Sequence, residues 1–173
     1  SKLNYVGSFE FCKNIKSISL PDSTKDTADG MFTGCEMLTS VKLPRKLKAI
    51  KAYDFADCRK LTKLNIPVTV KVVYMSAFAG SGLKKIVLPS NVQKIRNGND
   101  GQKVFEYIKG IGYPTKNLRV IEIHSKKVKS IQKNSFSGLS SKVVIKVPKS
   151  KKKKYTKMLR KSGLSKKVKI CNL

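Results

Sequence analysis

The sequence FTGCEMLTSVKLP, residues 32–44, returns in altered form along most of the chain and decides its fold. Its Phe32 belongs with Phe9, Phe55 and Phe78 to a series at a constant step of 23 residues. A repeat of roughly 20 to 29 residues is typical of solenoids, whose units cannot bury their apolar side chains alone. We therefore predict a stack of coils that share one continuous core.

The aligned units follow the pattern F-x-x-C-x-x-L-x-x-I-x-L-P, followed by V-x-x-I. The apolar residues that alternate before the proline predict a short half-buried strand, since successive side chains of a strand point to opposite faces. Proline ends that strand because it cannot donate to a ladder, and the V-x-x-I segment is expected to return on the opposite face. The six units begin near Phe9, Phe32, Phe55, Phe78, Phe105 and Phe136.

This pattern resembles the BspA-like type of leucine-rich repeat, with its signature L-x-x-I-x-I-P-x-x-V-x-x-I-x-x-x-A-F-x-x-C. The stretch SAFAGSGLKKIVLPSNVQKI, residues 76–95, matches closely but has Ser81 where the signature has cysteine. The resemblance implies a right-handed, β-rich leucine-rich-repeat solenoid of the α/β class. Such a solenoid has a parallel sheet of about six short strands on one face and short return strands opposite. The resemblance also implies a secreted or surface-anchored protein, mostly of anaerobic bacteria and in some cases of parasitic protists, and it does not imply a catalytic activity. We expect no cofactor.

We expect the repeats to occupy residues 1–148 and a basic C-terminal cap to occupy residues 149–173. The chain starts inside a unit, which leaves an open strand edge where two copies could pair, although a monomer is otherwise expected. No stretch approaches the length of apolar sequence that a membrane span needs.

The cap is predicted to be a short helix at about residues 150–162, followed by a short strand. Beyond the last repeat proline, the return positions would fall on lysines, which cannot serve as core. Tyr155, Met158 and Leu159 instead have the i, i+3, i+4 spacing of an amphipathic helix, with Gly163 as its C-cap.

The repeat period fails in two places. Residues 96–104 and residues 106–117 exceed the corresponding parts of earlier units, so they predict surface loops. Such loops either bind a ligand or are tolerated excursions with their tyrosines folded back over the core. The single carboxylate of Asp100 falls far short of the oxygen ligands that calcium takes. The candidate binding residues in these loops are Asn97, Asn99, Asp100, Tyr107 and Tyr113.

The side chains that point outward from the predicted sheet form a second candidate binding site, because solenoids bind ligands on surfaces built from successive repeats. This face has no aromatic anchor of the kind that dominates tight protein interfaces, so a plain solvated surface is the alternative. Its candidate residues are Lys63, Asn65, Lys85, Val87, Val120, Glu122, Val144 and Lys146.

Cys12, Cys35 and Cys58 also recur every 23 residues and are predicted to form a structural column of core thiols. Free cysteine is among the most buried residue types, so unpaired thiols are favoured, although neighbouring coils leave one disulfide open. Ligand spacings typical of zinc are missing. His124, the only histidine, is expected on the surface, since no nucleophile or second metal ligand accompanies it.

The formal net charge of +28 comes from 38 basic and 10 acidic residues, and residues 123–173 contain no acidic residue. A charge of this size favours an anionic partner, unless lysine is simply the common surface residue of a lysine-rich source. Specific nucleic-acid binding is not expected, because no aromatic platform or groove-shaped helix accompanies the lysines. The candidate polyanion patch consists of Lys149, Lys151, Lys152, Lys153 and Lys154.

These observations lead to two functional hypotheses. The first is a non-catalytic adhesion module of a secreted or cell-surface bacterial protein, which binds a host or neighbour-cell protein or glycan. The alternative is a structural domain that retains a larger protein on the cell wall by binding an anionic polymer through its lysine-rich surface. An enzyme is not expected, because no recognisable nucleophile and base motif is present.

Overall fold

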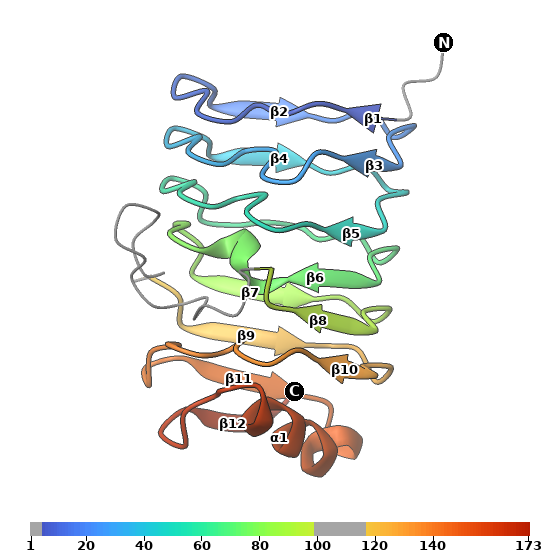
Figure 1. Cartoon of the computed structure of the whole chain (residues 1–173), viewed down its shortest axis with the longest axis vertical. Coiled ribbons are helices and arrows are strands. Elements are labelled where there is room, and N and C mark those ends of the chain that lie inside the picture. The colour runs from blue at the N-terminus through green and yellow to red at the C-terminus, as the bar shows by residue number, and fades with distance from the viewer. Residues whose placement is uncertain (1–4, 99–116) are drawn as a thin grey trace.

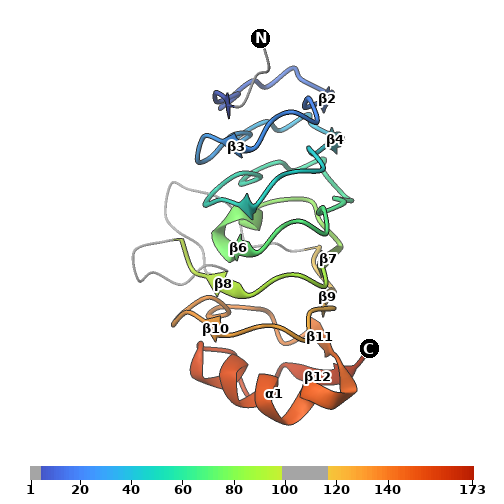
Figure 2. The ribbon, with the colours of Figure 1, turned by 90° about the vertical axis from the view of Figure 1, so that its right-hand side faces the viewer.

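The computed structural model describes residues 5–98 and 117–173 as a stack of coils along which the chain runs from one end to the other (Figure 1). Short strands alternate between two sides of the stack, as Figure 2 shows. The first set, here called the sheet face, consists of β2 (Ser17–Ser19), β4 (Ser40–Lys42), β7 (Lys85–Leu88), β9 (Val120–Ile123), β11 (Val144–Val147) and β12 (Lys169–Asn172). The second set, the return side, consists of β1 (Tyr5–Val6), β3 (Asp26–Thr27), β5 (Ala49–Ile50), β6 (Val72–Tyr74), β8 (Lys94–Arg96) and β10 (Ser130–Ile131).

All strand pairs in the described residues are parallel, as expected for leucine-rich repeats. The sheet face contains the sheets β2-β4 and β7-β9-β11-β12, and the return side contains β1-β3 and β5-β6-β8-β10. Ser17 of β2 lies opposite Ser40 of β4, one repeat further along the chain. Lys85 of β7 lies opposite Val120 of β9, so these two strands pair directly although both insertions separate them in the sequence.

The prediction of one continuous sheet with a strand from every unit is wrong at the third coil. Residues 63–66 form no strand, and among the described residues no backbone hydrogen bond joins them to β4 or β7. Leu61 and Ile66 are nevertheless buried in the core. A hollow of about 480 Å³, lined by Val41, Asn65 and Pro67 among others, lies between this segment and the second coil. On the sheet face, side-chain packing therefore holds the third coil in place, whereas its return strand β6 pairs with β5 and β8.

The repeated phenylalanines stack on one another through the core. The ring centroids of Phe9 and Phe32 lie 5.7 Å apart, and those of Phe32 and Phe55 lie 5.6 Å apart. The backbone of the same turn is tied from coil to coil, since the Phe32 N–H donates to the Asp54 carbonyl at 2.9 Å and the Phe55 N–H to the Ala77 carbonyl at 2.9 Å. The turn that carries the phenylalanine is thus both an apolar and a hydrogen-bonded contact between coils.

The cysteine thiols also link neighbouring coils by hydrogen bonds. Cys35 Sγ donates to the carbonyl of Phe9, and Cys58 Sγ donates to the carbonyl of Phe32, each at 3.1 Å. Cys35 and Cys58 are buried, Cys12 is half-buried, and all three are free thiols. Burial raises the pKa of the Cys35 and Cys58 thiols, which keeps them protonated as donors at neutral pH.

The C-terminal cap closes the last coil with a helix. The predicted helix at 150–162 is in fact a 3₁₀ turn at Lys149–Lys151 followed by α1 (Lys152–Lys161). Tyr155 and Leu159 of α1 are buried. The Tyr155 hydroxyl accepts the Val128 N–H and donates to the Ser125 carbonyl, both at 3.0 Å. It therefore satisfies backbone groups next to the last return strand.

None of the helices in the described residues is long and apolar enough to cross a bilayer.

Replacing Phe55 with alanine is expected to lower the free energy of unfolding by about 3–5 kcal/mol, because the lost ring leaves a cavity in the stack. Phe55 is 1% exposed, whereas Phe11 is 65% exposed and offers a matched control. Phe11→Ala should change the value by no more than about 0.5 kcal/mol. Urea unfolding followed by circular dichroism measures both variants, and equal losses would contradict a stacked core.

Tyr155→Phe is expected to cost about 1–3 kcal/mol, because the buried Val128 N–H loses its acceptor. Hydrogen exchange at the Val128 amide should accelerate in the variant. Tyr74→Phe is the control, since Tyr74 is only half-buried. Unchanged stability and unchanged exchange in Tyr155→Phe would show that the hydroxyl does not hold the cap.

Candidate functional site

The parallel register of β7, β9, β11 and β12 arranges the outward side chains of the sheet face in two rows. The first row is Lys85, Val120, Val144 and Lys169, and the second is Val87, Glu122, Lys146 and Cys171. Six of the eight predicted face residues stand in these rows. Lys63 and Asn65 are exposed but lie on the third coil, outside both sheets. The structure therefore brings most of the predicted face together in its C-terminal half.

Glu122 lies at the centre of this face and is 8% exposed, although the strand pattern predicted an outward residue. The reason is that three cationic or polar groups cover it. Lys85 Nζ lies 2.9 Å and Lys146 Nζ 3.6 Å from its Oε1, and His124 Nε2 lies 3.0 Å from its Oε2. The hydrogen bond from His124, assisted by the two ammonium groups, outweighs desolvation and lowers the pKa of Glu122 to about 2.

Three valines provide the apolar part of the face. Val120 and Val144 lie opposite each other on β9 and β11, and Val87 lies opposite Glu122 in the next row. All three are half-buried. The face thus combines a small apolar strip with a network of ion pairs and a hydrogen bond around one carboxylate.

Sequence reasoning missed three residues of this face. Lys169 and Cys171 join the rows because β12 pairs with β11, and His124 joins through its contact with Glu122. Lys169 and Cys171 flank the apolar Ile170, just as Val144 and Lys146 flank Ile145 on β11. This alternation in the sequence could have indicated that both residues point outward from a final strand.

Among the loop candidates, Asn97 is not available to a ligand. Its side chain is 1% exposed, its N–H donates to Gln132 Oε1 at 3.2 Å and its carbonyl accepts the Ser76 N–H at 3.2 Å. The sequence prediction of a binding residue is therefore wrong here, because the loop begins inside the core. The candidates Asn99, Asp100, Tyr107 and Tyr113 lie outside the described residues.

The polyanion patch is only partly open. Lys149, Lys153 and Lys154 are exposed, whereas Lys151 and Lys152 are half-buried. Next to it, a hollow of about 610 Å³ is lined by residues that include His124, Lys126, Lys149 and Ser150. This end of the stack can accommodate an anionic group. In residues 5–98 and 117–173, no cluster of histidine, cysteine or carboxylate side chains has the arrangement of a metal site.

The opposite end of the stack carries a hollow of different character. It measures about 390 Å³ and is lined by Glu10, Asp29, Asp57, Phe11 and Tyr53 among others. Carboxylates thus gather near the N-terminal turns, while lysines dominate the cap. The charge of the protein is polarised along the stack.

Stacked parallel strands, a turn that repeats its phenylalanine and cysteine, and a face built from equivalent residues of successive coils define a leucine-rich repeat protein. A profile described as the BspA type leucine rich repeat region matches residues 5–112 and 106–172, with six copies. The chain belongs to this BspA-type family.

Solved structures with the same fold come from several bacteria. The T. pallidum leucine rich repeat protein has a TM-score of 0.69 at 22% identity, covering 93% of this chain and 80% of that one. The pneumococcal vaccine antigen PcpA has a TM-score of 0.65 at 22% identity over 99% of this chain and 45% of that one. A leucine-rich repeat protein from Bacteroides ovatus has a TM-score of 0.51 at 14% identity over 97% and 55%. This chain therefore spans about half the length of the latter two. No curated protein matches the sequence.

The depressed pKa of Glu122 makes the stability of the sheet face depend on pH. A carboxyl group whose pKa falls on folding stabilises the folded state above its unfolded value near 4.5, and this contribution disappears as the pH falls toward about 2. Glu122→Gln is expected to flatten this part of the stability curve. Thermal unfolding at a series of pH values measures the difference between the two proteins.

The difference between the two stability curves also distinguishes Glu122 from Asp54. Burial raises the pKa of Asp54 to about 7, so Asp54 titrates in another pH range. A Glu122→Gln curve parallel to that of the wild type between pH 4.5 and 2 would contradict the charge network.

Proposed function

We propose that this chain is a non-catalytic interaction module of a secreted or cell-surface bacterial protein. It binds a host or neighbour-cell protein or glycan through the sheet face formed by β7, β9 and β11. Membership of a family of leucine-rich repeats, whose extended surfaces commonly bind other macromolecules, supports this assignment.

The observation that carries the proposal is the in-register face around Glu122. Its carboxylate is held by Lys85, Lys146 and His124, so the polar groups are already fixed before a ligand arrives. Val120 and Val144 supply apolar area directly beside them. Fixed polar groups beside exposed apolar area lower the ordering cost of binding. Tyr107 and Tyr113, which lie between β8 and β9 in the sequence, are proposed to extend the same site.

A second candidate function is retention on an anionic cell-wall polymer. The net charge of +28 and the exposed lysines of the cap favour it. Exposed charges are screened beyond about 8 Å at physiological salt, so this function is sensitive to ionic strength. Binding through the valines is not.

The double substitution Val120→Thr and Val144→Thr is expected to reduce binding about tenfold, because it removes the apolar contact while keeping the shape of the face. Val72→Thr on β6 is the matched control, since Val72 is also half-buried but lies on the return side. A glycan array and a panel of purified host matrix proteins, probed at low and high salt, measure the effect. Binding that is unaffected by the double substitution would exclude the sheet face, and binding lost at high salt would favour the wall polymer.

A further inference from the structure

Four lysines lie on successive coils of the return side. Lys48, Lys71 and Lys129 share one position of the coil, whereas Gln93 holds that position in the fourth coil and Lys94 follows it. The pairing of β5, β6, β8 and β10 stacks successive coils about 4.8 Å apart. Lys71 N–H donates to the Lys48 carbonyl at 2.8 Å, Lys94 N–H to the Lys71 carbonyl at 3.1 Å, and Lys129 N–H to the Gln93 carbonyl at 2.8 Å. All four lysine side chains are exposed. We call Lys48, Lys71, Lys94 and Lys129 the lysine column.

The column has no carboxylate partner in the part of the chain that the structure describes. The nearest acidic residue along the return side is Asp26 of β3, and Lys51 already holds its carboxylate at 3.0 Å. Like charges opposite each other on neighbouring strands repel. The stacking of the coils places Lys48 next to Lys71, with Lys94 and Lys129 on the coils that follow, so a bound polyanion would reduce the repulsion among them.

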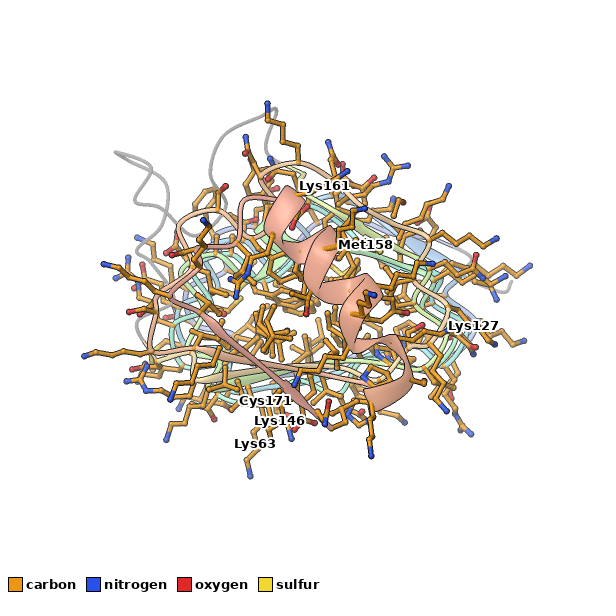
Figure 3. All side chains as sticks on the ribbon, turned by 90° about the horizontal axis from the view of Figure 1, so that it is seen from below. Lys63, Lys127, Lys146, Met158, Lys161 and Cys171 are labelled. Atoms are coloured by element: carbon orange, nitrogen blue, oxygen red, sulfur yellow. The ribbon has the colours of Figure 1, made fainter. Side chains whose placement is uncertain are left out.

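The lysine column is a different surface from the sheet face. Seen along the stack, Lys127 lies on another side from Lys63 and Lys146 (Figure 3). On the sheet face, Lys85 and Lys146 both contact the carboxylate of Glu122, which offsets one of their two charges. The return side is therefore the better anion-binding surface, although both sides carry lysines.

The column leads to the basic hollow beside the cap. Lys126 and Lys127 belong to the same turn as Lys129, and Lys126 lines the hollow together with Lys149. Lys127 Nζ bonds only a neutral oxygen among the described residues, Asn91 Oδ1 at 3.0 Å. Exposed lysines therefore occur on each coil from the second coil to the start of the cap.

We propose that the lysine column, together with Lys126 and Lys149 at its C-terminal end, binds a linear anionic polysaccharide laid along the stack. This inference rests on the second of the proposed functions, and it names the class of polymer and the residues that hold it.

Spacing and residue type favour a polysaccharide over a nucleic acid. One cation per coil is comparable with one charged sugar per step of an extended polymer, whereas duplex DNA carries one charge per about 1.7 Å. Single-stranded nucleic acids need aromatic rings on which bases stack. The Tyr74 ring on β6 is already covered by the Arg96 guanidinium, 6.0 Å from its centroid. Lysine is a hydrated point charge without fixed geometry, which suits sulfate and carboxylate groups whose positions vary along a polymer.

The test compares two variants that lose the same charge. In the first, Lys48, Lys71, Lys94 and Lys129 are all replaced by glutamine. In the matched control, the exposed lysines Lys13, Lys16, Lys60 and Lys84 are replaced by glutamine. Binding to heparin, a sulfated polysaccharide, is measured by calorimetry at several salt concentrations, with uncharged dextran as the blank. Circular dichroism establishes that both variants fold.

The column variant is expected to bind heparin about tenfold more weakly, since four exposed ion pairs contribute a few tenths to about 1 kcal/mol each. The control should lose less than about threefold, because it changes only the long-range field. Heparin should also raise the melting temperature of the wild type more than that of the column variant.

Equal losses in the two variants would overturn the lysine column while leaving retention by overall charge intact. Absence of any heparin binding by the wild type would overturn both the column and the second proposed function. Tighter binding of a single-stranded polynucleotide than of heparin would overturn the choice of polysaccharide.

Discussion

No coil of this protein can bury its apolar side chains without the coils on either side of it. The Phe32 ring is stacked between those of Phe9 and Phe55, and the thiol of Cys58 reaches back to the carbonyl of Phe32. Because of this dependence, residues at equivalent positions of successive coils form a line through the molecule. The repeat that forms the core therefore also places similar side chains next to each other on the surface, even where their charges repel.

The two surface lines differ in how their charges are balanced. On the sheet face, one carboxylate at Glu122 gathers two lysines and a histidine around itself. On the return side, Lys48, Lys71, Lys94 and Lys129 lie on successive coils, and among the described residues no carboxylate contacts them. The first arrangement favours a ligand recognised by shape and apolar contact, and the second favours one recognised by its charge. Binding of the first kind is expected to change little with salt, whereas binding of the second kind is expected to weaken as the salt concentration rises.

Much of the fold was predictable from the period, and less of the candidate site. Spacing alone located the thiols, the outward rows and the buried Tyr155 of the cap. It could not show that residues 63–66 lack a ladder, because an apolar pattern reports which side chains are buried and says nothing of how the backbone is paired. It also could not show that Asn97 is buried, since the sequence does not distinguish an asparagine whose backbone is held by Gln132 and Ser76 from one in an exposed turn. Lys169 and Cys171 escaped notice because the register of β12 belongs to the cap and not to the repeat.

The interruptions in the two sets of strands fall at different heights of the stack. On the return side, β3 and β5 are not paired, but β2 and β4 of the same two coils are paired on the sheet face. On the sheet face, the ladder is interrupted at residues 63–66, but on the return side β5, β6 and β8 are paired there. At least one ladder of backbone hydrogen bonds therefore joins each pair of neighbouring described coils. No step between neighbouring described coils therefore depends on side-chain packing alone.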